Sequence, residues 1–252
     1  MILTIANIYF KETLRNIGVV FGNILPTIMF LIISIVLKNM ESIDSETLDF
    51  IIRGQFISMS ILLTIFSLAF SGGTVYLIDK RTERAFEWLD KTDIKFLDFF
   101  MGLGLGIFII FNIFLTMILL AFGTITAIEL TDIMRILLIS NFTLLALYPL
   151  SYIISTLFPN GKMATSMLLP LMLLLLFSVT MTDLFVSLSD NDPQTYYKYL
   201  IWNPMLFLND SVQYILGLSK SPWMNTENYL IVLVLLFILL FFVSKKSFKY
   251  LK

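Results

Sequence analysis

The sequence predicts an all-α integral membrane protein in which a single transmembrane domain covers residues 1–252. Of these residues, 58% are hydrophobic and 14% are charged, whereas soluble domains average about 45–50% and about 25%. The mean hydropathy is +0.89. Six separate stretches reach the roughly 20 apolar residues that a helix needs to cross the hydrocarbon core of a bilayer. These observations favour six membrane-spanning helices.

Composition also argues against several classes of function. A formal net charge of -1 and a pI near 5.5 provide no basic surface for a phosphate backbone, so nucleic-acid binding is not expected. The chain has no cysteine and no histidine, which removes disulfides, thiolate ligands, the commonest general base and the commonest zinc ligand. We therefore expect no catalytic residue and no metal site in this chain.

The first element, residues 1–17, is predicted to be an amphipathic helix in the membrane interface. At 100° per residue its polar side chains share one face: Thr4, Asn7, Lys11 and Arg15. Apolar side chains such as Ile5 and Tyr9 cover the other face, a pattern suited to the boundary between lipid and water. An extension of the first span is the alternative. The charges in this segment are not typical of a cleavable signal.

Six spans are expected to follow this helix. They cover residues 18–37, 55–78, 96–122, 136–157, 163–182 and 228–244. The fourth and fifth are separated by FPNGK at 158–162, and its proline, asparagine and glycine favour a tight reversal of the chain. We therefore expect these two spans to form a helical hairpin.

Lysine and arginine are distributed unevenly between the two predicted sides of the membrane. With the amino terminus inside, 12 of the 17 lie in cytoplasmic segments, as the positive-inside rule requires. Both termini are therefore expected in the cytoplasm of a bacterial cell. The interiors of the predicted spans contain no Asp, Glu, Lys or Arg, although ion-coupled carriers usually place such groups there. Energy for transport is thus expected from outside the membrane region.

Residues 79–95 form the densest charge cluster and are predicted to contain a cytoplasmic helix. Ala85, Phe86 and Leu89 would share its apolar face. Charged side chains would form the opposite face: Glu83, Arg84, Glu87, Asp90 and Lys91. An exposed helix of this kind offers an apolar knob and mixed charge to a soluble partner. An ordinary solvated loop is the alternative.

Four glycines in the predicted spans are interpreted as helix-packing positions: Gly72, Gly73, Gly102 and Gly106. The last two have the small-xxx-small spacing that lets helices approach closely. Gly102, Gly104 and Gly106 do not form a phosphate-binding loop, because they lie in an apolar helix. The pair Gly161 and Lys162 does not complete one either, because Met163 replaces the required hydroxyl residue. No nucleotide-binding motif is therefore expected.

The segment 183–227 is predicted to form two short outer helices that are re-entrant or lie in the outer membrane interface. Asp192 with Pro193 is a good start for the first helix, and Asn203 with Pro204 separates it from a second helix. The segment is rich in aromatic residues typical of membrane boundaries: Tyr196, Tyr197, Tyr199, Trp202, Tyr214 and Trp223.

Taken together, these features resemble the permease subunits of type-2 ABC transporters. The resemblance covers the whole topology. Members often carry Gly-Thr-Leu-Glu-x-Leu followed by Thr-Pro in the connection between the second and third spans. Here Phe86, Glu87, Leu89 and Thr92 fit that run, whereas Arg84 and Ala85 replace Gly-Thr and Asp93 replaces Pro.

The resemblance implies a transporter in which this chain pairs with a second permease, identical or different, among membrane lipids. Two copies of a separate ATPase subunit would bind ATP and magnesium, and no cofactor is expected here. The resemblance assigns docking of the ATPase to Glu83, Arg84, Phe86, Glu87, Trp88 and Leu89. The chain is also similar to exporters of staphylococcal phenol-soluble modulins and to bacteriocin immunity transporters, which implies export of amphipathic peptides or hydrophobic antimicrobial compounds. A sodium-coupled carrier and a non-transport scaffold or holin-like protein are the alternatives.

Overall fold

The computed structural model describes residues 1–40, 44–89, 91–92, 94–189 and 191–250. Within these ranges the regular structure is helical, with no strand, and six helices are long and apolar enough to span a membrane. They are Val20–Lys38, Thr47–Thr82, Phe96–Thr126, Leu130–Ser155, Gly161–Leu188 and Thr226–Tyr250. The predicted all-α class and the predicted number of spans are confirmed.

The elements follow the chain with short connections. The α-helices are α1 (Ile2–Arg15), α2 (Ile17–Lys38), α3 (Ser45–Asp49), α4 (Ser58–Thr64), α5 (Gly72–Thr82), α6 (Ala85–Leu89), α7 (Phe96–Thr126), α8 (Leu130–Ser155), α9 (Gly161–Leu188), α10 (Pro204–Ile215) and α11 (Thr226–Ser247). Two π-helical segments, η1 (Phe50–Ile57) and η2 (Ile65–Ser71), join α3, α4 and α5 into one long helix. The 3-10 segments are η3 (Pro193–Tyr199) and η4 (Phe248–Tyr250).

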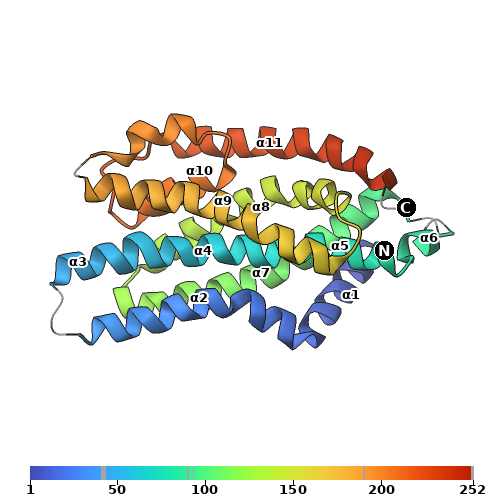
Figure 1. Cartoon of the computed structure of the whole chain (residues 1–252), viewed down its shortest axis with the longest axis horizontal. Coiled ribbons are helices and arrows are strands. Elements are labelled where there is room, and N and C mark those ends of the chain that lie inside the picture. Colours follow the sequence, from blue (N-terminus) through green and yellow to red (C-terminus); the bar gives the residue numbers. More distant parts are fainter. Residues whose placement is uncertain (41–43, 90, 93, 190, 251–252) are drawn as a thin grey trace.

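The spanning helices lie side by side along the long axis of the molecule (Figure 1). Both chain termini and α6 lie at one end, which we call the termini end, and α3 lies at the opposite end, the far end. The chain bends at Asn16 (φ -91°, ψ 62°), so that α1 runs at a steep angle to α2. The bend allows α1 to cross the bundle at the termini end.

Glycines of α7 allow α1 to lie directly on that helix. A Cβ atom at Gly102 would lie 2.7 Å from Cβ of Ile5, and one at Gly106 would lie 2.8 Å from Cδ1 of Tyr9. Ile5 and Tyr9 are buried in this contact. The small-xxx-small face of α7 therefore holds the amino-terminal helix.

The other two glycines lie at the start of α5. A Cβ atom at Gly73 would meet Cδ1 of Ile107 at 3.0 Å, and one at Gly72 would meet the carbonyl oxygen of Ser67 at 3.3 Å. A side chain of α7 thus approaches the backbone of Gly73 closely, while α5 packs mainly on α8 and α9.

Helix α8 lies at the centre of the bundle and packs against α5, α7, α10 and α11. Asn141 of α8 and Asn112 of α7 exchange two amide hydrogen bonds of 2.8 and 2.9 Å. In apolar surroundings such bonds contribute about 1 kcal/mol each. By contrast, α2, α9 and α11 present broad exposed apolar faces, as expected of helices that contact lipid tails.

Two expectations about the second half of the chain require correction. The turn at Thr156–Asn160 reverses the chain between α8 and α9, but α9 packs mainly against α4, α5 and α10 instead of lengthwise along α8. Helix α9 also continues six residues beyond the predicted end at Thr182, which takes Asp183 into the helix. The span is therefore not free of charged residues.

Candidate functional site

The short helix α6 follows the end of α5 at the termini end. Arg84, in the turn between them, has a φ of 57°, in the left-handed region that residues other than glycine rarely adopt. Its backbone N–H donates to the carbonyl oxygen of Arg81 (3.0 Å), and its own carbonyl oxygen accepts from the N–H of Glu87 (3.2 Å). The sharp turn makes α6 a separate helix and not a continuation of α5.

Phe86 anchors α6 to the bundle. Its side chain is 1% exposed, and its ring centre lies 5.4 Å from that of Phe99 in α7 and 5.6 Å from that of Phe248 after α11. The Phe248 ring lies 5.1 Å from that of Phe96. Aromatic pairs at such distances are favourable beyond the area they bury. We call Phe86, Phe96, Phe99 and Phe248 the aromatic anchor.

The helical pattern predicts that Phe86 is exposed on the apolar face of this helix, and that prediction is wrong. The aromatic anchor turns Phe86 toward the bundle, because the rings of Phe99 and Phe248, which come from other helical elements, pack against it. Glu83, Arg84 and Glu87 are exposed. The side chains of Trp88 and Leu89 lie outside the described residues. Docking of a partner on this helix remains a prediction.

Charged side chains link the end of α5 to its neighbours. Lys80 Nζ lies 3.1 Å from Glu12 Oε1 of α1 and 3.0 Å from Glu83 Oε2. Arg81 donates to the carbonyl oxygen of Ser155 (3.0 Å), the last residue of α8, and to that of Phe158 in the following turn. The end of α8 is a favourable position for a cation because its last carbonyls are partially negative. A movement at the end of α5 would therefore act on α1 and α8 as well as on α6.

A cavity of about 660 Å³ lies between α1, α2 and α5, and we call it the termini-end cavity. Its charged lining consists of Glu12, Asp79, Lys80 and Glu83, and its apolar lining includes Val20, Leu68, Val75 and Ile110. The charged residues lie near the ends of α1 and α5, whereas Leu68 lies on the same long helix closer to the middle of the bundle. Tyr9 also lines the cavity, and burial raises the pKa of its phenol to about 12. The cavity is thus amphipathic, with a charged mouth and an apolar floor.

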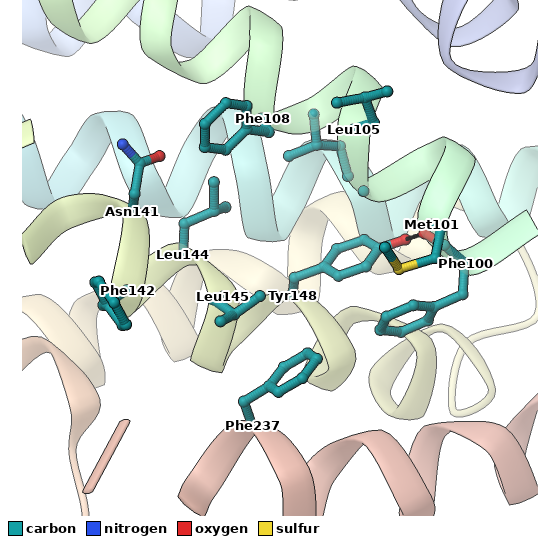
Figure 2. A pocket seen from close by; sticks show the side chains of 12 residues that line it. Phe100, Met101, Leu105, Phe108, Asn141, Phe142, Leu144, Leu145, Tyr148 and Phe237 are labelled. Atoms are coloured by element: carbon teal, nitrogen blue, oxygen red, sulfur yellow. Dashed lines mark hydrogen bonds between the residues drawn. The ribbon is translucent and has the colours of Figure 1, made fainter. Parts of the chain in front are cut away.

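A second hollow of about 670 Å³ lies between α7, α8 and α11. Figure 2 shows aromatic and aliphatic side chains around it, including Phe237 of α11. Its polar side chains are already partnered, since Asn141 is bonded to Asn112 and the Tyr148 hydroxyl donates to the carbonyl oxygen of Phe100 (2.6 Å). This hollow suits hydrocarbon such as lipid tails.

Asp183, to which the sequence pattern assigns no role, is buried at the far end. It is 5% exposed. Its carboxylate accepts a hydrogen bond from the Tyr197 hydroxyl (2.8 Å) and another from Nδ2 of Asn209. These bonds connect α9 to η3 and α10.

Asp210 of α10 is the second buried carboxylate, at 1% exposure. It accepts from Nε2 of Gln194 (3.2 Å), from the backbone N–H of Trp223 (2.9 Å) and from the Tyr229 hydroxyl. Burial raises the pKa of Asp210 above its ordinary value. The sequence did hold a signal, because Asn209 and Asp210 interrupt an apolar run, and buried polar groups require partners.

The predicted outer residues divide into buried and exposed sets. Asn203 is buried, accepts from the N–H of Met205 (3.0 Å) as the cap of α10, and donates to the carbonyl oxygen of Leu175 (2.6 Å). Pro204 is buried with it, whereas Tyr196 and Trp202 are exposed. Helix α10 packs against α4, α8 and α9, so it enters the bundle, as the re-entrant alternative predicts.

The ring of Trp223 is half-buried, and its centre lies 6.0 Å from that of Tyr197. This contact packs the segment before α11 against η3. Among the described residues, no group of three or more acidic side chains is arranged to hold a metal ion.

Comparison with known proteins identifies the family. The profile of the family described as "ABC-2 family transporter protein" matches residues 44–244, which is most of the 252-residue chain and includes α6, the aromatic anchor except Phe248, and both buried carboxylates. No curated protein matches the chain. The chain therefore belongs to the ABC-2 family of transporter proteins, multi-pass membrane subunits that work with an ABC ATPase subunit.

Proposed function

We propose that this chain is the permease of an ATP-driven exporter that moves amphipathic peptides or hydrophobic antimicrobial compounds out of a bacterial cell. The observation that carries the proposal is the termini-end cavity. Its charged mouth and apolar floor match a molecule with one polar and one apolar side. The cavity also shares Lys80 and Glu83 with the segment that leads into α6, so occupancy and movement of α6 are physically linked.

Two ATPase subunits would dock on α6 of two permease copies, and ATP with magnesium would be bound by those subunits. Glu83, Arg84 and Glu87 offer exposed charges for docking. The aromatic anchor would transmit a movement of α6 into the bundle, because it joins α6 to α7 and to the end of α11. Lys80 and Arg81 at the end of α5 would transmit the same movement to α1 and α8. Closure of the ATPases would thereby change access to the cavity.

The proposed orientation places both termini and α6 in the cytoplasm. The chain has no cysteine, so single cysteines can report the side of the membrane. A membrane-impermeant thiol reagent should label Ser221→Cys in intact cells and Ser247→Cys only after permeabilisation. The reverse labelling pattern would exclude this orientation.

Transport itself is tested with the chain and its co-purified ATPase in lipid nanodiscs and in inside-out vesicles. Amphipathic peptides should stimulate ATP hydrolysis and should accumulate in the vesicles only when ATP is supplied. A complex with an inactive ATPase subunit is the matched control. The proposal is wrong if neither amphipathic peptides nor hydrophobic antibiotics change ATP hydrolysis and none is moved.

A further inference from the structure

We propose that the termini-end cavity selects cationic amphipathic molecules. The inference deepens the proposed function and rests on it. In this view the cationic group of the cargo binds the carboxylates of Glu12, Asp79 and Glu83 in place of Lys80. The apolar part of the cargo then lies along the floor of the cavity.

The side chains that line the cavity have a net negative charge. Three of the lining residues bear a carboxylate and one bears an ammonium group, so their formal charge is -2. Lys80 contacts two of the carboxylates, Glu12 and Glu83. Unlike charges within a few ångströms attract, and like charges repel. An anionic cargo would therefore be repelled at the mouth and a cationic one attracted.

The ion pairs of Lys80 are exchangeable. The side chains of Glu12 and Glu83 are 44% and 61% exposed, and exposed ion pairs contribute little net stability because water competes for both partners. An arriving ammonium or guanidinium group can therefore compete with Lys80, whose own side chain is 20% exposed, for these two carboxylates.

An aromatic ring in the same cavity already holds a cation. Lys80 Nζ lies 5.4 Å from the ring centre of Tyr76, which is within the range of a cation–π interaction. Tyr9 packs edge-on against this ring at 4.8 Å, and both rings line the cavity. The site therefore combines carboxylates with an aromatic face, a common recognition pattern for organic cations.

The apolar floor of the cavity would select for the apolar part of the cargo. Val20 and Leu68 pack together with Ile24 in a buried apolar cluster, and Ile110 adds a further apolar surface. From Leu68 to Glu83 the helix extends roughly 20 Å at 1.5 Å per residue. A cargo with its cation at one end and several apolar groups along its length fits this shape.

The test uses one amphipathic helical peptide in three versions whose polar face carries lysine, glutamine or glutamate. Each is titrated against the ATP hydrolysis of the permease–ATPase complex in nanodiscs of uncharged lipid. The lysine version should half-stimulate at a concentration about tenfold lower than the glutamate version, since both attraction and repulsion contribute. The glutamine version should fall between them.

Variants of the lining locate the effect. Glu12→Gln and Asp79→Asn should each raise the half-stimulating concentration of the lysine peptide about fivefold, as expected for one partly exposed charge pair. Lys80→Gln should lower it, whereas a purely structural role of Lys80 predicts a rise. The glutamine peptide, measured on the same preparation, reports whether each variant is still assembled. Glu227→Gln removes a carboxylate at the far end and should leave all three concentrations unchanged.

The outcomes separate the two proposals. Equal stimulation by the three peptides, or a lysine preference that Glu12→Gln and Asp79→Asn both leave intact, would overturn charge selection at this cavity and leave the export function standing. Absence of stimulation and of ATP-dependent movement for every peptide would overturn the export function and, with it, this inference.

Discussion

The charged side chains at the two ends of the molecule differ in their exposure and in their partners. At the termini end, Lys80 and its carboxylate partners are paired with opposite charges and are reached by water. At the far end, Asp183 and Asp210 are buried, and among the described residues their hydrogen-bond donors are neutral groups. Exposed ion pairs rearrange at little cost, whereas a buried carboxylate that loses its donors is strongly destabilised.

The difference indicates which end is suited to move. Asp183 and Asp210 fix η3, α10 and the start of α11 to one another at the far end. At the termini end the contacts that resist separation are apolar and lie in the aromatic anchor and in the packing of α1 on α7. The comparison therefore predicts that the termini end depends on packing and the far end on hydrogen bonds.

The largest effect is expected from Phe86→Ala. Removal of this ring leaves a cavity beside Phe99 and Phe248, and a buried Phe→Ala change costs about 3–5 kcal/mol. Peptide-stimulated ATP hydrolysis should also be lost, because α6 would no longer be held to α7. Thermal unfolding in detergent and ATPase assays measure the two effects. Phe242→Ala, at a ring that is 65% exposed, is the matched control. If Phe86→Ala is as stable as the wild type, the aromatic anchor does not stabilise the termini end.

Asp210→Ala should produce the next largest effect. The change leaves the donors of Gln194, Trp223 and Tyr229 without their acceptor, and we expect a loss of about 3 kcal/mol. The measurement is again thermal unfolding. Asp192→Ala removes a carboxylate that caps η3 through a single bond to the N–H of Gln194 (2.9 Å) and should cost about 1 kcal/mol. If the two variants unfold alike, Asp210 does not hold the far end together.

A pH dependence confined to the far end should be smaller. Because burial raises the pKa of Asp210 above its ordinary value of 3.8, the folded protein binds the proton more tightly than the unfolded chain. The protonated Asp210 carboxyl group therefore adds to the free energy of unfolding fully below the ordinary pKa. This contribution is lost as the pH rises through the raised pKa. The free energy of unfolding of the wild type should fall over that window relative to that of Asp210→Asn, measured by tryptophan fluorescence during unfolding. Parallel pH profiles of the two proteins would contradict the assignment.

Glu87→Gln should have the smallest effect on stability. Glu87 Oε1 lies 3.8 Å from Arg84 Nε, and both side chains are exposed, so the unfolding temperature should change by less than the equivalent of about 0.5 kcal/mol. Less ATPase subunit should nevertheless co-purify with the variant, because the lost charge faces the proposed docking surface. Full retention of the ATPase would show that Glu87 takes no part in docking.

Much of the fold could be predicted from the sequence, because span number depends on local hydropathy and capping depends on local residue type. Asp192 and Asn203 cap η3 and α10 as their sequence positions indicate. The direction of Phe86 could not be predicted in this way. A helical wheel gives the face on which Phe86 lies, but only the distant rings of Phe99 and Phe248 decide that this face turns inward.

Asp183 was missed for a related reason. A hydropathy pattern ends a span where polar residues begin, at Thr182 and Asp183, whereas the folded chain supplies Tyr197 and Asn209 as partners. Helix α9 can then continue to Leu188. Buried polar networks assembled from distant segments lie beyond any local pattern.

The two π-helical segments of the second span have a consequence for the geometry of coupling. A π turn holds more residues than an α turn, and each residue of an α-helix advances the chain by roughly 100°. The angular setting of α5 relative to α3 thus depends on how η1 and η2 are wound. If η2 gave up one residue to ordinary α winding, Lys80 and α6 would rotate about the helix axis while the far end stayed in place. The winding of η2 would then set the angular position of α6 relative to the far end.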